Sequence, residues 1–216
     1  MPLLLQKNIE SGVIGLWDIS EALEELELLA DLTPTDAINY SVISAIHRKK
    51  EWLATRALLN ELTGERTLIK YHNDGRPFPD NSKYHISISH TTGFVAIMLH
   101  RFNLPGIDIE LSSRQVSKVA SRFLSPEEFD VCHETSGFSN HKLLLHWCAK
   151  EAIFKMVPFS DIEFSTDIRI KLGDSNRDSG SFQGLFIGKP GQVPVALEFL
   201  EIKGVILVWG CTGEFR

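Results

Sequence analysis

The sequence predicts a mixed α/β fold, of the α+β kind, in which small antiparallel sheets pack with helices. Two segments, residues 85–100 and 195–212, each contain two strand-like runs joined by a short turn, as β-hairpins do. Other long segments carry apolar residues at helical spacing. Each hairpin pattern belongs to a stretch with helix before it, which indicates an internal duplication and therefore two similar halves.

The boundary between the halves is expected near Asn103–Gly106, where "NLPG" interrupts the periodic patterns. This places an N-terminal half at residues 1–105 and a C-terminal half at residues 106–216. A chain of 216 residues has room for two compact halves of roughly 100 residues each, and also for one large domain. A substantial core can form in either case.

In the first half, "GVIGLWDIS" at residues 12–20 predicts a strand and the acidic segment 21–32 predicts a helix. Thr33 then has the features of a helix cap, since Pro34 and Asp36 follow it in the first turn. Helical spacing continues from residue 38 to Gly64, either as one long helix or as two helices broken near "HRKK".

The second half opens with "GIDIE", a short strand pattern at residues 106–110. Alternate side chains of a strand share a face, so Asp108 and Glu110 project together, opposite Ile107 and Ile109. Two like charges held this close repel each other, and we therefore expect a positive group beside them.

Three helices are expected after this strand. Residues 112–124 predict one that carries Arg114, Lys118 and Arg122 along a single face. Residues 125–128, "SPEE", have the form of a capping box at the start of a second helix. The segment 140–158 predicts the third, from an Asn cap through dense apolar content to a closing proline.

Composition limits the classes of function. The formal net charge of −6 argues against a protein that coats nucleic acid or an anionic membrane. The three cysteines are widely spaced and show no zinc or disulfide pattern, which fits a reducing compartment. The first residues lack a basic leader, and no apolar run approaches membrane-spanning length, so we expect a cytoplasmic protein.

Three carboxylates suggest a metal site. Asp108, Glu110 and Glu151, if brought together, form an all-oxygen ligand set of the kind that Mg²⁺ uses with water and substrate phosphates. Lys155, one helical turn beyond Glu151, would then reach those phosphates. Taken alone, Glu151 and Lys155 would make only a surface ion pair; the combination of all four predicts phosphoryl chemistry.

Further candidate anion-binding groups precede the acidic strand. Arg48 and Lys49 lie in a basic cluster within an acidic chain, where each by itself is most often a solvated helix residue. Arg76 stands in a loop stiffened by glycine and proline, which suits the presentation of a guanidinium to a phosphate. Ser89 and His90 end an apolar alternation next to a turn, where a purely structural strand would carry neither.

Taken together, "GIDIE", "WCAKEAIFK", "GRPF" and "SISH" resemble the signature segments of the 4′-phosphopantetheinyl transferase superfamily. The resemblance is to its larger monomeric type, which activates carrier proteins of peptide and polyketide synthetases. It implies a pseudo-dimer of two similar α/β halves with the active cleft between them. It also implies a holo-[acyl-carrier-protein] synthase activity, in which the phosphopantetheine arm of coenzyme A passes to a serine of an apo carrier protein and adenosine 3′,5′-bisphosphate is released.

The resemblance also assigns roles to residues. It implies that Asp108, Glu110 and Glu151 hold Mg²⁺ and that Lys155 contacts the pyrophosphate of coenzyme A. Arg48 or Lys49, with Arg76, Ser89 and His90, would hold the coenzyme's phosphates, in the N-terminal half. Glu151, directly or through a metal-bound water, is the candidate base for the serine hydroxyl.

Two alternatives stay open at this level. The same acids suit a Mg²⁺-dependent hydrolase that splits the pyrophosphate of coenzyme A-like nucleotides with water. The chain could also be a coenzyme A-binding module without catalysis, whose acids cap helices and pair with lysines. The carrier, whether of fatty acid, peptide or polyketide synthesis, is not indicated, and an internally duplicated cleft predicts a monomer.

Overall fold

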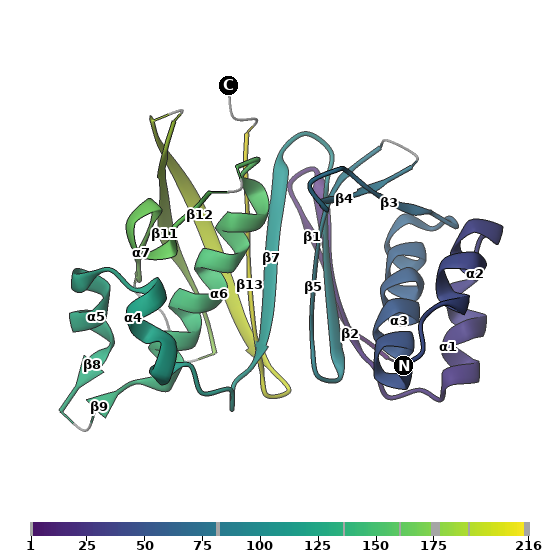
Figure 1. Ribbon diagram of the computed structural model, residues 1–216, viewed down its shortest axis with the longest axis horizontal. Coiled ribbons are helices and arrows are strands. Elements are labelled where there is room, and N and C mark those ends of the chain that lie inside the picture. Colours follow the sequence, from purple (N-terminus) through teal and green to yellow (C-terminus); the bar gives the residue numbers. More distant parts are fainter. Residues whose placement is uncertain are drawn as a thin grey trace. The chain divides into compact units, whose positions relative to one another are not determined.

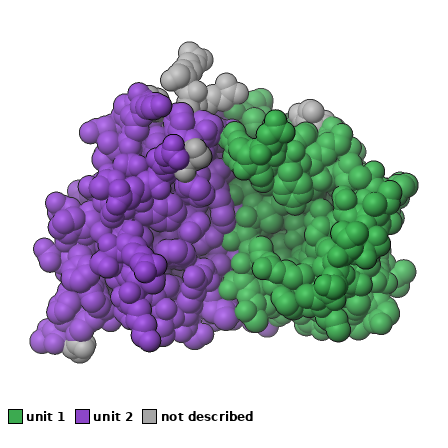
Figure 2. All heavy atoms as spheres, viewed as in Figure 1, with its two compact units in different colours: residues 1–102 green, residues 103–216 purple. Residues whose placement is uncertain are grey.

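The computed structural model describes residues 2–80, 83–135, 137–159, 161–173, 178–189 and 191–213. The chain divides into two compact units, unit 1 at Met1–Phe102 and unit 2 at Asn103–Arg216 (Figure 2). Each unit contains an antiparallel sheet and helices, which confirms the predicted mixed α/β class. The pseudo-dimeric relation of the halves, and the roles assigned to each of them, stay predictions.

Unit 1 pairs a four-stranded antiparallel sheet with three helices (Figure 1). The sheet has the strand order β1-β2-β6-β5, and β3 and β4 form a separate small hairpin. The elements are β1 Leu3–Ile9, β2 Gly12–Asp18, α1 Leu23–Ala30, α2 Pro34–Ser41, α3 Ile46–Thr63, β3 Ile69–Tyr71, β4 Pro77–Pro79, β5 His85–Thr91 and β6 Phe94–His100.

Local chemistry explains the helices of unit 1. The side chain of Thr33 accepts a hydrogen bond from the backbone N–H of Asp36, as predicted for the cap of α2. α3 ends at Gly64, whose φ of 69° is the left-handed conformation that glycine adopts most readily. The break that makes α2 and α3 two helices falls at residues 42–45, just before the basic cluster.

Unit 2 contains a five-stranded antiparallel sheet in the order β10-β11-β12-β13-β7. Its elements are β7 Leu104–Leu111, the 3₁₀ turn η1 Ser117–Val119, α4 Ala120–Phe123, α5 Pro126–Cys132, β8 His133–Glu134, β9 Gly137–Phe138, α6 Asn140–Met156, α7 Phe164–Asp167, β10 Ile168–Lys171, β11 Ser179–Gly188, β12 Gly191–Ile202 and β13 Val205–Thr212. Lys203 and Gly204 both have positive φ in the turn that joins β12 to β13, as tight hairpins require.

The central packing of unit 2 is α6 against β7 and β13 (Figure 1). A Cβ atom added to Gly106 would lie 2.0 Å from the carbonyl oxygen of Ala152, so only glycine allows strand and helix to approach this closely. The apolar side of α6 joins a core that includes Leu144, Cys148 and Ile153. This contact brings the two segments with the most suggestive motifs together.

Two expectations for unit 2 need correction. Residues 112–124 are not one helix, because β7 continues to Leu111 and helical structure begins only at Ser117. Arg114 therefore lies before the helical turns and does not share a face with Lys118 and Arg122. The cap of α6 is Ser139, and Asn140, expected there, is the first helical residue.

The described part of the chain contains no helix that combines the length and apolar character needed to cross a membrane. All three cysteines are free thiols, in agreement with the prediction that no disulfide forms.

Candidate active site on β7 and α6

Asp108 and Glu110 lie on the face of β7 that is covered by α6. Both residues are largely buried, with 5% and 8% of their surface exposed. They alternate with Ile107 and Ile109, which lie on the opposite face of the sheet. The strand is thus buried on both sides, and its two acids need positive partners inside the protein.

Those partners are Lys155 and Arg114. The Nζ atom of Lys155 lies 2.8 Å from Oδ1 of Asp108 and also donates to the carbonyl oxygen of Ile107 at 2.9 Å. Arg114 forms an ion pair with Glu110, four residues before it in the chain. The positive charge expected beside the acid pair is therefore supplied from α6 and from the loop after β7.

Glu151 stands on α6, four residues before Lys155, and is half-buried. Burial raises the pKa of the Glu151 carboxyl, and the negative charge of Asp108 raises it further, while Lys155 and Arg114 act in the opposite direction. This coupling places Glu151 electrostatically with the acid pair of β7. The structure thus brings the three carboxylates and Lys155 into one region of unit 2.

Two neighbours of this region were not assigned roles from the sequence. The indole Nε1 of Trp147 donates to Oε1 of Glu110 at 3.3 Å, and the guanidinium of Arg114 lies over the Trp147 ring, 5.3 Å from its centre. Burial raises the pKa of the Cys148 thiol well above its usual value, and the negative charge of Asp108 raises it further. Trp147 stands one helical turn before Glu151, on the same face of α6. This spacing is the sequence signal that could have identified Trp147 as part of the candidate site.

These residues provide the ligand type that Mg²⁺ prefers, since all three side chains are oxygen donors. Within the ranges that the structure describes, however, no three His, Cys, Asp or Glu side chains form a group arranged to hold a metal ion. Asp108 and Glu110 are instead neutralised by Lys155 and Arg114. The donor set fits a hard cation in kind, and its present arrangement is that of a charge-compensated cluster.

A second group of predicted residues meets in unit 1. Nη1 of Arg48, on α3, lies 3.1 Å from Nε2 of His90, on β5, and 3.3 Å from Oε2 of Glu51. Nε2 of His90 also lies 3.8 Å from Oε2 of Glu51, so Arg48, Glu51 and His90 meet at one place. The Arg48 side chain is 59% exposed and keeps donors for a further anion.

The other candidates in unit 1 lie apart from this pair. Lys49 is rotated by about 100° from Arg48 around α3, and its Nζ lies 4.8 Å from the centre of the Tyr40 ring. Arg76 forms an ion pair with Asp74 at 2.7 Å in the turn between β3 and β4. Ser89 is buried on the strand next to His90, and the alternation of β5 directs the two side chains to opposite faces.

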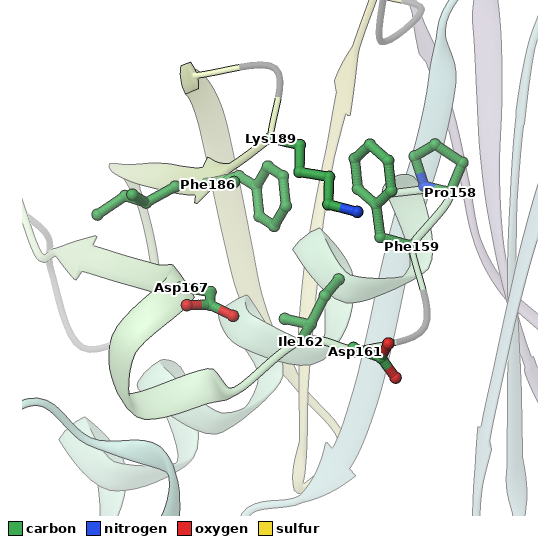
Figure 3. A pocket seen from close by; sticks show the side chains of 9 residues that line it. Pro158, Phe159, Asp161, Ile162, Asp167, Phe186 and Lys189 are labelled. Atoms are coloured by element: carbon green, nitrogen blue, oxygen red, sulfur yellow. The ribbon is translucent and has the colours of Figure 1, made fainter.

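A surface cavity of about 280 Å³ lies in unit 2 beyond the end of α6 (Figure 3). The nearly parallel rings of Phe159 and Phe186 form its apolar wall, and Lys189 reaches over it. Asp161 and Asp167 border the cavity on the side of α7. None of the predicted site residues lines this cavity.

Comparison with known protein families covers the segment that contains β7 and α6. Residues 105–198 match the family model of the 4′-phosphopantetheinyl transferase superfamily. This segment is a domain of that superfamily. The match confirms the resemblance for the part of the chain that holds Asp108, Glu110, Glu151 and Lys155, and it supports phosphopantetheinyl transfer as the general activity.

The transferase domain covers a little under half of the chain, and Arg48, Lys49, Arg76, Ser89 and His90 lie outside it. The superfamily acts on carrier proteins with coenzyme A as substrate, typically with Mg²⁺. No curated protein matches the chain.

Proposed function

We propose that this protein transfers the 4′-phosphopantetheine arm of coenzyme A to a serine of an apo carrier protein, in a Mg²⁺-dependent reaction of the holo-[acyl-carrier-protein] synthase kind. The observation that carries the proposal is the ion pair of Lys155 with Asp108 where α6, the helix that also carries Glu151, packs on β7 inside the matched domain.

In the proposed reaction the serine Oγ attacks the β-phosphorus of the coenzyme A pyrophosphate. The bond from that phosphorus to the bridging oxygen breaks, and adenosine 3′,5′-bisphosphate leaves with the electron pair. Asp108, Glu110 and Glu151 would hold Mg²⁺, which supplies positive charge against the oxygens on which negative charge develops. Glu151 accepts the serine proton, and Lys155 binds the pyrophosphate as a point charge.

Arg48 and His90 are proposed to bind the coenzyme's 3′-phosphate, because they meet at one place and Arg48 is exposed there. Their geometry favours Arg48 over Lys49, whose ammonium lies against Tyr40. Arg76 and Ser89 are proposed to contact the remaining phosphates of the coenzyme.

Lys118 and Arg122 are proposed to dock the acidic carrier protein. Both are exposed and follow β7 closely in the chain. Arg114, which was expected to belong to the same basic face, is held by Glu110 and Trp147 and is more suited to orienting the site. A reducing cytoplasm fits the three free cysteines, and we propose that the protein works there as a monomer.

The decisive experiment incubates the protein with coenzyme A, Mg²⁺ and a panel of apo carriers from fatty acid, peptide and polyketide synthesis, and weighs each carrier by mass spectrometry. The expected result is a carrier that gains the mass of one phosphopantetheine, with none gained after chelation or when the carrier serine is changed to alanine. Glu151→Gln should abolish the gain, whereas Asp130→Asn, an exposed acid of α5, should retain it.

Three outcomes separate the alternatives. Free phosphopantetheine released with every carrier unchanged would show a hydrolase. Coenzyme A binding that needs no metal, survives Asp108→Asn and yields no product would show a binding module. Either result contradicts the proposed transferase.

A further inference from the structure

Lys150, on α6, is fully buried although lysine is seldom removed from water. Its Nζ atom donates to Oε2 of Glu128 at 2.7 Å and to the carbonyl oxygens of Phe164 at 2.8 Å and Ile168 at 2.6 Å. An ammonium group has three N–H donors, and all three are used. The charge is therefore both paired and completely hydrogen-bonded.

Glu128 is also buried, and both of its carboxylate oxygens accept hydrogen bonds. It is 4% exposed; Oε2 accepts from the backbone N–H of Ser125 at 2.8 Å, and Oε1 accepts from the backbone N–H of Ile170 at 2.6 Å. We call Lys150 and Glu128 the buried clamp. Through these bonds the clamp joins the start of α5, the middle of α6, the first residue of α7 and strand β10.

The clamp bonds α6 to β10, which stands at the opposite end of the strand order from β7. Trp147 and Lys155 reach β7 from one face of the helix, through Glu110 and Asp108. Successive residues of an α-helix are rotated by about 100°, so Lys150 points about 60° from Trp147, about 100° from Glu151 and about 140° from Lys155. α6 is thus bonded to both ends of the strand order, to β7 through Trp147 and Lys155 and to β10 through the clamp.

We infer that Lys150 and Glu128 are positioning residues that fix the rotation of α6 and thereby the place of Glu151 and Lys155 relative to Asp108. The inference rests on the proposed function of that site. Neither clamp residue touches the reacting atoms in this reading. The clamp acts as the outer support of a metal ligand, and the loss of such support typically weakens metal binding by about 10–100-fold.

The alternative is that the clamp only stabilises unit 2. A purely structural pair would lower the melting temperature of the variant and leave the metal affinity of the folded molecules unchanged. A positioning pair must change metal affinity in molecules that are folded. Metal affinity, measured below the melting transition, therefore separates the two roles.

The experiment uses the full chain with Mn²⁺ as a probe, its binding followed by electron paramagnetic resonance, and carrier modification followed in parallel. The first variant is Glu128→Gln, which keeps the acceptor for Ile170 and replaces the oxygen that faces Lys150. The second is the pair Glu128→Gln with Lys150→Met, which removes both charges at once. Near-ultraviolet circular dichroism identifies the temperature range in which each variant is folded.

A matched control exists in unit 1. Arg56 and Asp36 also form a buried pair, 4% and 2% exposed, with Nε of Arg56 3.3 Å from Oδ1 of Asp36. The variant Asp36→Asn with Arg56→Met loses a buried pair of the same kind that supports none of the proposed metal ligands. It should lower the melting temperature and keep the wild-type affinity for Mn²⁺.

The expected result is an increase of about tenfold or more in the Mn²⁺ dissociation constant of the double clamp variant, and of about threefold in Glu128→Gln. The rate constant at saturating coenzyme A and metal should fall more than the KM for coenzyme A rises. If the double variant does not fold, the Mn²⁺ affinity of Glu128→Gln alone tests the inference.

A folded clamp variant with wild-type Mn²⁺ affinity would overturn the inference, as would an equal loss in the Arg56–Asp36 control. A wild-type protein that binds Mn²⁺ but modifies no carrier would instead contradict the proposed function, and the ratio of affinities would still decide the role of the clamp. A wild-type protein that binds no Mn²⁺ would overturn both.

Discussion

The ammonium group of Lys155 lies 2.8 Å from the carboxylate of Asp108, between the strand and the helix that carry the motifs of the transferase domain. Asp108 is 5% exposed, so this contact provides charge compensation inside the protein. The same lysine is the proposed ligand of the coenzyme pyrophosphate. Substrate binding would therefore require Lys155 to exchange, at least in part, a carboxylate partner for a phosphate.

Lys155→Met tests this double role. We expect kcat/KM for coenzyme A to fall by about 10²–10³, because a charge aimed at the transition state is lost. The melting temperature should also fall, since Asp108 loses its ion pair. Steady-state kinetics and thermal unfolding measure the two effects. Lys171→Met, at an exposed position of β10, should change neither; an unchanged kcat/KM in the Lys155 variant would exclude the lysine from the reaction.

Arg48 and Lys49 are distinguished by a substrate that lacks the 3′-phosphate. We expect Arg48→Gln to raise the KM for coenzyme A by about tenfold, through the loss of one charge-assisted contact, and to leave the KM for 3′-dephospho-coenzyme A unchanged. Lys49→Gln should have little effect on either substrate, because its ammonium lies over Tyr40. The reverse pattern in the two variants would transfer the phosphate contact to Lys49.

His146 should make the stability of the protein depend on pH. Burial lowers the pKa of this fully enclosed ring below its usual value of 6.5, although its bond to the carbonyl of Lys142 opposes the change. The stability that the neutral ring provides is complete above pH 6.5. It is lost as the pH falls from 6.5 toward the lowered pKa, because the unfolded chain takes up the proton first.

Urea unfolding between pH 7.5 and 5.5 measures this contribution, which is about 1.4 kcal/mol per pH unit at most. His146→Gln should reduce the slope of unfolding free energy against pH in the acid range. It should not remove the slope, because burial also lowers the pKa of His100. His47→Gln, at an exposed position, should keep the wild-type slope; an unchanged slope in His146→Gln would show that the ring does not titrate in this window.

Gly106 controls the approach of β7 to α6. Gly106→Ala should destabilise the protein by about 1–3 kcal/mol, because its Cβ would meet the carbonyl oxygen of Ala152 at 2.0 Å and push strand and helix apart. Metal affinity should fall with it, since the acids of the strand move away from Glu151. Chemical unfolding and Mn²⁺ binding measure the two effects. Gly213→Ala, where an added Cβ meets no atom within 4 Å, is the matched control.

Much of the fold is predictable because its signals are local. The cap at Thr33, the capping box at Ser125 and the turn at Lys203–Gly204 depend on residues a few positions apart, and each forms as expected. The segment after β7 was predicted wrongly because tertiary contacts outweigh helical spacing there. Arg114 pairs with Glu110 and lies over Trp147, which holds its backbone outside the helix.

The candidate site likewise combines features that local sequence predicts with features that depend on tertiary packing. Strand alternation is enough to put Asp108 and Glu110 on one face. The bond from Lys150 to Glu128 joins residues 22 positions apart, and no periodic pattern signals it. The choice between Arg48 and Lys49 likewise depends on which side of α3 meets β5, and packing in three dimensions decides that.

The acidic strand has an unusual place in the order of synthesis. β7 opens unit 2, yet its sheet partner is β13, the last strand of the described chain, so that Leu104 pairs with Thr212. Asp108 and Glu110 therefore leave the ribosome about a hundred residues before the strand that completes their sheet. A nascent chain, or one truncated before β13, would carry these two acids on a strand without its sheet partner, and the sheet that holds the proposed catalytic centre is complete only after β13 has been synthesised.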